Sequence, residues 1–375
     1  MTKKRNGEIE VLRLFFTIAV LIFHSQFVSN GDTYPMFHGG WLGVEFFFLV
    51  SGYLMAAYED RLPALTDHRK IGSDTASCVL RKAEILYPYM AFAIVANLLG
   101  WRAFTNGMTF PPFAAGELKG FASSLLNFIF PYSLGYKDYS YLGYSWYLSA
   151  MIWGMMLIFP LLRRNRNLFY CVLAPVFVAF GLGYYSGHYD ILGFVYANGD
   201  LLSGGLIRGI AEMSMGCLCY KISKKFAGGG ILSKNGRIAI TIFEIICFSI
   251  VSYRVVFFQE DGVLDYIIFF LMAIVVTIAF SGQSMLAFQI SGRLASLSGK
   301  FNLALYLNSN CWSYMTARAW PEMCYWKATA VYLCMTLVSA LVCMGVCDGL
   351  QMLWKAKVKE KMCKFLLTNA PRGGQ

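Results

Sequence analysis

Long apolar runs alternate with short polar segments along the whole chain. A helix that crosses a membrane needs about 20 mainly apolar residues. Ten segments approach this length and predict membrane helices, at residues 11–28, 40–58, 83–101, 145–162, 168–186, 206–222, 238–257, 264–280, 301–319 and 328–349. An even number of helices places both chain ends on one side of the membrane. We therefore expect an all-α polytopic membrane protein.

The polar segments show on which side most of the positive charge lies. With ten helices, 25 of the 32 Lys and Arg residues fall on the side that holds both chain ends. Basic residues are enriched in cytoplasmic loops, so we expect both termini in the cytoplasm. This topology explains the formal net charge of +11 without a nucleic-acid partner.

The composition agrees with a chain that is built almost entirely into a lipid bilayer. Hydrophobic residues make up 57% of the chain and charged residues 14%, whereas a soluble domain has about 25% charged residues. We expect a membrane domain at 1–353 and a basic cytoplasmic tail at 354–375 that rests on the inner leaflet as an amphipathic helix. The 11 cysteines lack metal-ligand spacing, so neither a disulfide framework nor a metal site is predicted.

The longest outer connection, 102–144, contains an apolar run that is too short to cross a membrane. This run predicts an interfacial or re-entrant segment. An aromatic tract follows it and ends at Trp146 and Tyr147. Aromatic side chains are typical of the membrane interface, but they also stack on sugar rings, so these two residues are candidates for binding a carbohydrate.

The first two predicted helices carry three ionisable side chains, Arg13, His24 and Glu45. Such a group at the centre of a membrane helix is unfavourable by about 3 kcal/mol, so it usually has a function. Arg13 and His24 are separated by about three helical turns, which places them on one face about 16 Å apart. Arg13 is expected near the cytoplasmic mouth, and His24 near the outer end at a depth similar to that of Glu45.

A carboxylate beside an imidazole fixes its tautomer and raises its basicity. We therefore predict that Glu45 orients His24 as a general base. Glu10 lies one turn before Arg13 and is expected to pair with it. A fixed cation at the inner mouth and a base toward the outer face fit a substrate that spans the distance between them, such as an acyl group on a long phosphorylated carrier.

Several motifs resemble those of membrane-bound acyltransferase family three, the integral membrane enzymes that O-acylate sugars and surface polysaccharides. Arg13 and His24 match that family's Arg, ten residues, His pattern on the first helix. GVEFFFLVSGY at 43–53 is similar to its second-helix motif, G-V-[DE]-x-F-F-x-x-S-G-[FY]. Later segments that resemble the family are LRKAEILYP, WYLS, IRGIAEMSMGCLCY and LASLSGKFNLALYL, so the resemblance covers nearly the whole chain.

The resemblance implies transfer of an acyl group, expected to be acetyl, from cytoplasmic acyl-CoA to a hydroxyl of a cell-surface or lipid-linked carbohydrate. It implies that Arg13, Arg81 and Lys82 bind acyl-CoA, and that the protein lies in a bacterial inner or plasma membrane. The chain ends shortly after the last predicted helix. We therefore expect direct transfer to the acceptor or transfer through a separate acyl-accepting partner protein.

Two positions depart from the family pattern. Arg81 and Lys82 are followed by Glu84 and Ile85, where the family commonly pairs basic residues three apart. Ser309 stands where the family usually has a histidine, so the role of that histidine does not transfer to this chain.

Other interpretations of these residues stay open at the level of sequence. Arg208 either pairs with Glu212 four residues later or, near the outer mouth, binds the acceptor. A transporter of a lipid-linked sugar or small solute would use His24 and Glu45 as a proton relay. A membrane scaffold without catalytic activity would tolerate substitution of these residues.

Overall fold

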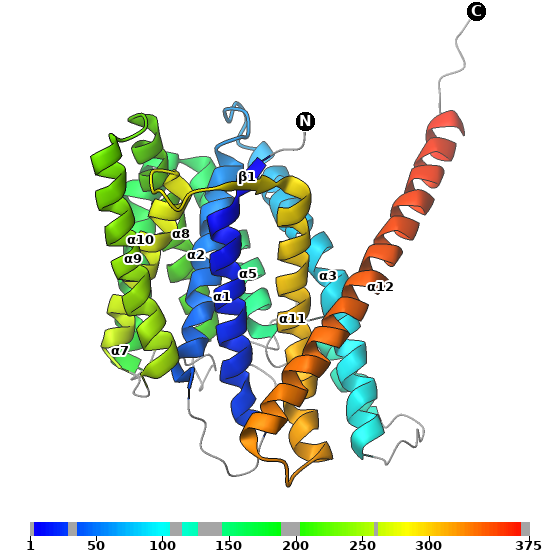
Figure 1. The fold of residues 1–375 in the computed structure, drawn as a ribbon. Coiled ribbons are helices and arrows are strands. Elements are labelled where there is room, and N and C mark those ends of the chain that lie inside the picture. Colours follow the sequence, from blue (N-terminus) through cyan, green and yellow to red (C-terminus); the bar gives the residue numbers. More distant parts are fainter. Residues whose placement is uncertain are drawn as a thin grey trace, which may run out of the picture.

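The computed structural model describes residues 4–28, 36–105, 115–126, 145–188, 203–258 and 262–368 as a bundle of long helices (Figure 1). Side chains are described in these ranges except at 101, 103–105 and 353–368. Helix α1 begins and α12 ends at the same end of the bundle (Figure 1). We call this the terminal end and the opposite one the far end.

Successive long helices run in opposite directions between these two ends. In chain order they are α1 (Gly7–Phe23), the 3₁₀ turns η1 (His24–Phe27) and η2 (His38–Leu42), α2 (Gly43–Glu59), α3 (Lys70–Thr105), α4 (Ala115–Leu125), α5 (Trp146–Arg164), α6 (Arg166–Leu168), the π-helical turn η5 (Phe169–Leu173), α7 (Ala174–His188), α8 (Gly204–Gly228), α9 (Lys234–Phe257), α10 (Leu264–Ser281), α11 (Gly292–Ala319) and α12 (Tyr325–Thr368).

Seven of the ten predicted segments lie on a single helix or begin one residue before it, and the segments 11–28, 40–58 and 168–186 each cover a helix and the turn or short helix next to it. Among the described residues, seven helices are long and apolar enough to cross a membrane. They include η2 with α2, α3, α5, the continuous stretch from α6 to α7, α9, α10 and α12. Helices α1, α8 and α11 are shorter or carry more polar side chains. The helical membrane fold is therefore confirmed, while the count of ten spans and the cytoplasmic termini remain predictions.

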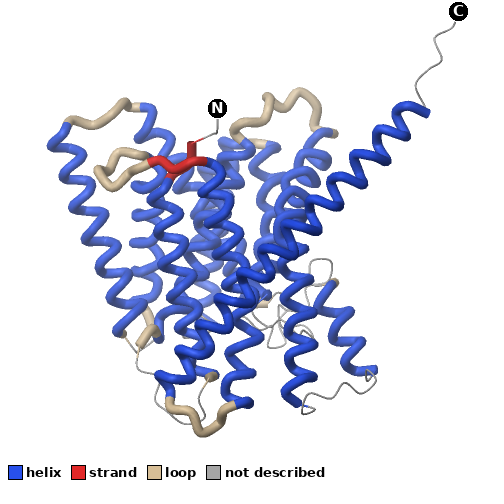
Figure 2. The backbone as a smooth tube through the Cα atoms, turned by 45° about the vertical axis from the view of Figure 1, so that its right-hand side comes forward, coloured by secondary structure: helices blue, strands red, loops and turns tan. Residues whose placement is uncertain are grey.

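Two short strands interrupt the otherwise helical fold, and the sequence did not predict them. Strand β1 (Lys4–Asn6) pairs antiparallel with β2 (Gln289–Ser291), and Figure 2 shows this pair in red at the terminal end. Asn6 also donates a 2.6 Å hydrogen bond from Nδ2 to the carbonyl of Ala279. Three-residue strands are too short to show an alternating pattern. The pair ties the start of α1 to the segment that leads into α11.

Helices α2 and α8 cross at the centre of the bundle, and each contributes to both of its large hydrophobic clusters. Their backbones approach closely because a glycine faces the partner helix on each side. A Cβ at Gly52 would lie 2.0 Å from the carbonyl oxygen of Met213, and a Cβ at Gly216 would lie 2.1 Å from that of Leu49. Small residues at a helix interface permit such close packing in membranes.

Two of the sequence predictions concern segments outside the central bundle. Helix α12 continues without a break through Thr368, so the predicted basic tail begins as an extension of the last helix, which runs past its neighbours (Figure 1). Helix α4 has 11 residues, which is too short to cross a membrane. The remainder of the predicted outer segment, at 106–114 and 127–144, lies outside the described residues.

Candidate functional site

The first two helices pack against each other with a different offset from the one predicted. The rings of Phe16 and Phe46 stack with 4.5 Å between their centroids, which places Glu45 close to the level of Phe16. His24 lies eight residues beyond Phe16, about 12 Å further along the axis. The offset arises because η2 runs against α1, where a Cβ at Gly40 would meet the carbonyl oxygen of Ala19 at 2.4 Å.

Glu45 pairs with Arg208 instead of His24, which corrects the predicted orientation of His24 by Glu45. The Nε of Arg208 donates a 2.9 Å hydrogen bond to Oε2 of Glu45, and its Nη2 forms an ion pair with Oε1. The same Nε contacts Oε1 of Glu212 at 3.0 Å, so the predicted i, i+4 pair is confirmed. The three side chains are at most 2% exposed. We call them the carboxyl–guanidinium cluster.

Two tryptophans stack on the guanidinium of this cluster. The centroids of Trp41 and Trp146 lie 5.4 Å and 5.3 Å from Cζ of Arg208, which is within the range of cation–π attraction. Arg208 is therefore occupied by two carboxyl groups and two rings, and Trp146 stacks on a protein cation. From the sequence, Trp146 was a candidate for binding the acceptor and acceptor binding was one of two interpretations of Arg208; contact of either residue with an acceptor stays a prediction.

His24 caps the far end of α1 and begins η1. The helical backbone is continuous from Arg13 to His24, so these two residues retain the predicted spacing and common face. The imidazole is half-buried, and its ring lies 5.3 Å from that of Phe23 and 6.5 Å from that of Phe27. The next residue, Ser25, shares a 2.6 Å hydrogen bond with the hydroxyl of Tyr325 on α12.

Basic side chains from two helices meet nearer the terminal end. Nη1 of Arg13 is 2.6 Å from Oε1 of Glu10, so the predicted i, i+3 pair is confirmed. Lys82 on α3 lies near enough to Arg13 for their positive charges to repel each other. Arg81 is exposed and lies over the ring of Tyr58, with 5.4 Å between its Cζ and the centroid. The structure thus places Arg13 and Lys82 within electrostatic range of each other and leaves Arg81 at an exposed position on α3.

Tyr147 is buried in the interior and its ring faces α11. Its hydroxyl is within range of the charge of Arg13 and 3.9 Å from the sulfur of Met151, to which Ser51 also donates at 3.3 Å. Its ring is 6.0 Å from that of Tyr306. Consecutive residues of α5 therefore face different parts of the interior, with Trp146 on Arg208 and Tyr147 toward Arg13.

The departures from the family pattern also have a place in the structure. Ser309 is fully buried in α11 and donates a 2.7 Å hydrogen bond to the carbonyl of Tyr306. One residue later, Nδ2 of Asn310 donates to Oδ1 of Asn97 on α3 at 3.0 Å. The position that holds a histidine in the family therefore belongs here to a polar stretch of α11 that packs against α3.

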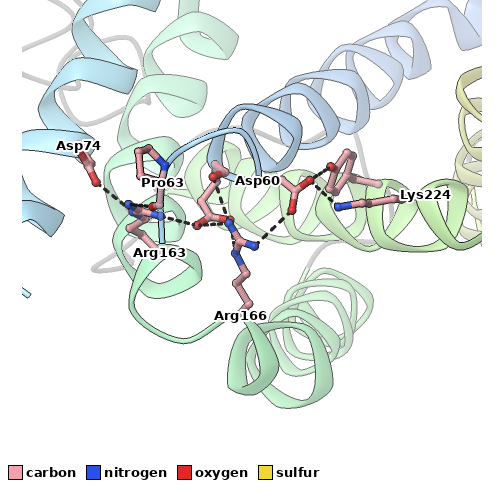
Figure 3. A network of polar contacts seen from close by, with 8 residues as sticks. Asp60, Pro63, Asp74, Arg163, Arg166 and Lys224 are labelled. Atoms are coloured by element: carbon pink, nitrogen blue, oxygen red, sulfur yellow. Dashed lines mark hydrogen bonds and ion pairs between the residues drawn. The ribbon is translucent and has the colours of Figure 1, made fainter. Parts of the chain in front are cut away.

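An ionic network at the terminal end joins four regions of the bundle (Figure 3). Glu59, at the end of α2, pairs with Arg163 at 3.2 Å and with Arg166 at 2.8 Å. Arg163 also reaches Asp74 on α3 at 2.9 Å, and Asp60 pairs with Lys224 on α8 at 2.5 Å. From the sequence, the basic residues of this network were explained by membrane topology alone, because only their approach to the carboxylates in space shows that they pair.

The described ranges of the chain contain no cluster of three or more His, Cys, Asp or Glu side chains that could hold a metal ion. The groups that could take part in chemistry are the half-buried imidazole of His24, the basic pair of Arg13 and Lys82, and the carboxyl–guanidinium cluster.

Comparison with known proteins gives one family and one group of curated relatives. A family model described as an acyltransferase domain matches residues 6–348. The O-acetyltransferase OatA of Staphylococcus aureus strain NCTC 8325 / PS 47 is 23% identical over 324 residues, which cover 81% of this chain and 49% of that protein. OatA of strains COL and MRSA252 matches to the same extent. The chain spans about half the length of these relatives, and no solved structure matches it.

Proposed function

The chain belongs to the acyltransferase-domain family, and from this premise we propose that it is a membrane O-acyltransferase. It moves an acyl group, expected to be acetyl, from acyl-CoA to a hydroxyl of a cell-surface or lipid-linked carbohydrate in the plasma membrane. The observation that carries the proposal is the continuous face of α1, which presents Arg13 next to Lys82 and His24 at the far end.

The basic pair supports a binding site for the phosphates of acyl-CoA. Two cations within electrostatic range of each other in a membrane protein repel each other, and an anion bound between them relieves this repulsion. The ion pair with Glu10 orients the guanidinium of Arg13. A guanidinium offers phosphate several hydrogen-bond donors in a fixed geometry. The pantetheine arm then runs along α1 and brings the thioester toward His24.

The chemical step uses the imidazole of His24 as a general base. It removes the proton of the acceptor hydroxyl while the oxygen attacks the thioester carbonyl. The carbon–sulfur bond breaks, and the departing thiolate of CoA takes the proton back from the imidazolium. Glu45 has a supporting role in this scheme, because its contacts hold α2 against α8 through Arg208. This pairing also favours the transferase over the proton-relay transporter, which required Glu45 beside His24.

Replacement of His24 by Ala tests the proposal. The purified variant is reconstituted into liposomes and supplied with labelled acetyl-CoA and with glycan acceptors from the host envelope. Transfer of the label to the acceptor is then measured. A general base contributes about 100-fold or more, so we expect at least that loss of transfer. His68→Ala is the matched control, because His68 is exposed in the connection between α2 and α3. Full transfer by His24→Ala at normal membrane levels would refute the mechanism.

A further inference from the structure

The carboxyl–guanidinium cluster contains more negative than positive groups. Glu45 and Glu212 both contact Nε of Arg208, at 2.9 Å and 3.0 Å. The two carboxyl groups therefore lie against each other on a single cation. With all three groups at most 2% exposed, water does not screen their repulsion, and two adjacent ionised carboxylates in such a setting are strongly disfavoured.

Among the described residues, the neighbouring helices contribute no additional positive charge that would balance the second carboxyl group of the cluster. Arg254 on α9 is 2.7 Å from Asp265 on α10, and both are buried. Counting this pair, the region holds three carboxyl groups and two guanidinium groups. The charge of Asp265 also acts on Glu45. Among the described residues, the other titratable groups that act on Arg208 or respond to it are the phenols of Tyr185 on α7 and Tyr306 on α11.

The contacts indicate which carboxyl group is neutral. Arg208 holds Glu45 through two of its nitrogens, a geometry that suits an ionised carboxylate. Arg208 contacts Glu212 through Oε1 alone, so Oε2 is the oxygen that no cation reaches among the described contacts, and the carboxyl group faces Glu45. A protonated carboxyl group can hold a hydrogen on that oxygen and needs less compensation when it is buried.

We propose that Glu212 is protonated in the active protein and that its proton keeps Glu45 ionised and fixed on Arg208. Glu212 is thus a positioning residue. If it ionised, it would compete with Glu45 for the guanidinium and loosen the stack of Arg208 between Trp41 and Trp146. Because Trp41 leads into α2 and Trp146 begins α5, this would disturb the entry of both helices.

Infrared spectroscopy of the purified protein tests the protonation state without any assay of activity. The wild type at neutral pH should show a carbonyl stretching band of a protonated carboxyl group that Glu212→Gln lacks. Glu117→Gln is the matched control, because Glu117 on α4 pairs with Arg102 near the end of α3, away from the carboxyl–guanidinium cluster, and this variant should retain the band. An unchanged spectrum in Glu212→Gln would overturn the assignment, whether or not the protein proves to be an acyltransferase.

The pH dependence of acyl transfer tests the positioning role, and this part rests on the proposed function. Activity of the wild type should fall at alkaline pH as Glu212 ionises, whereas Glu212→Gln, which cannot ionise, should retain its activity there. Glu212→Ala should lose at least about tenfold at neutral pH, and Glu212→Gln should recover most of this loss. If the activity of Glu212→Gln fell at the same alkaline pH as that of the wild type, the positioning role would be overturned. A residue needed only for folding would change the amount of protein and not the pH at which activity falls.

Discussion

Arg13 and Lys82 are the residues whose neighbourhood most directly predicts a substrate contact. They come from α1 and α3 and lie near enough to repel each other. Replacing either by Gln should raise the KM for acyl-CoA by about tenfold, because one charge-assisted contact to phosphate is lost. The value of kcat should change less, since neither residue lies at the imidazole.

Arg81 offers a matched comparison for this measurement. It is the neighbour of Lys82 in sequence, but it is exposed and lies over Tyr58. Arg81→Gln should therefore change the KM for acyl-CoA by less than either of the other two variants. A larger effect of Arg81→Gln would show that the donor binds on the outer face of α3, away from Arg13.

Single residues also show where sequence reasoning about the site succeeds. Pairs within one helix could be predicted from spacing, as for Glu10 with Arg13 and for Arg208 with Glu212. The pairing of Glu45 with Arg208 joins residues 163 positions apart, and no local pattern encodes it. Spacing along α1 gave the common face of Arg13 and His24, but the depth of Glu45 depended on how η2 enters the bundle.

Among the elements, the crossing of α2 and α8 is the one most sensitive to side-chain size. Gly52→Ala places a methyl group against the backbone of Met213, where the carbonyl oxygen lies 2.0 Å from the new Cβ. Backbone cannot move aside as a side chain can, so we expect a loss of about 1–3 kcal/mol or more in stability. The measurement is the thermal unfolding midpoint and the yield of monodisperse protein in detergent.

Gly345→Ala is the control for this variant. Gly345 lies within α12, and a Cβ at this position would meet nothing within 4 Å. Its replacement should leave the midpoint unchanged or raise it slightly, because Ala has the higher helix propensity. Equal effects at Gly52 and Gly345 would mean that the α2–α8 contact does not limit stability.

The elements themselves were largely predictable, because runs of about 20 apolar residues have few alternatives to a membrane helix. Apolar length did not reveal the 3₁₀ turn η2 or the strands β1 and β2, which are three to five residues long. It also did not show that α12 continues past the predicted membrane boundary, because a helix can extend into water without any change in its backbone.

For the whole molecule, the ionic network at the terminal end fixes the ends of α2, α5 and α8 and the start of α3 relative to one another (Figure 3). Hydrogen bonds from Lys224 and then Tyr220 hold the pKa of the Asp60 carboxyl below its usual range. The folded state therefore favours the ionised form. Its contribution to stability is complete above the ordinary carboxyl pKa of about 3.9 and is lost as the pH falls through the lower pKa of the folded state.

Asp60→Asn tests this dependence. The variant should unfold at a lower temperature than the wild type at neutral pH, and the difference should close as the pH falls below about 4. Asp67→Asn is the control, because Asp67 is exposed in the same connection and its side chain accepts, among the described contacts, only from the backbone N–H of Arg69 at 2.9 Å. If the difference in unfolding temperature between Asp60→Asn and the wild type stayed constant with pH, Asp60 would stabilise the protein through packing or neutral hydrogen bonds and not through its charge.

The pairing of β1 with β2 sets the order in which the molecule can be completed. Asn6 bonds to Ala279, 273 residues later, and β1 finds its partner strand only after α10 has been made. Contacts between such distant parts of a chain form late and slowly. The helix that carries Arg13 and His24 is synthesised long before β2, so the strand pair that anchors its start forms only after α10 has been made. Until then the start of α1 lacks its strand contact, and we expect the proposed transferase to become active only when assembly of the bundle is nearly finished.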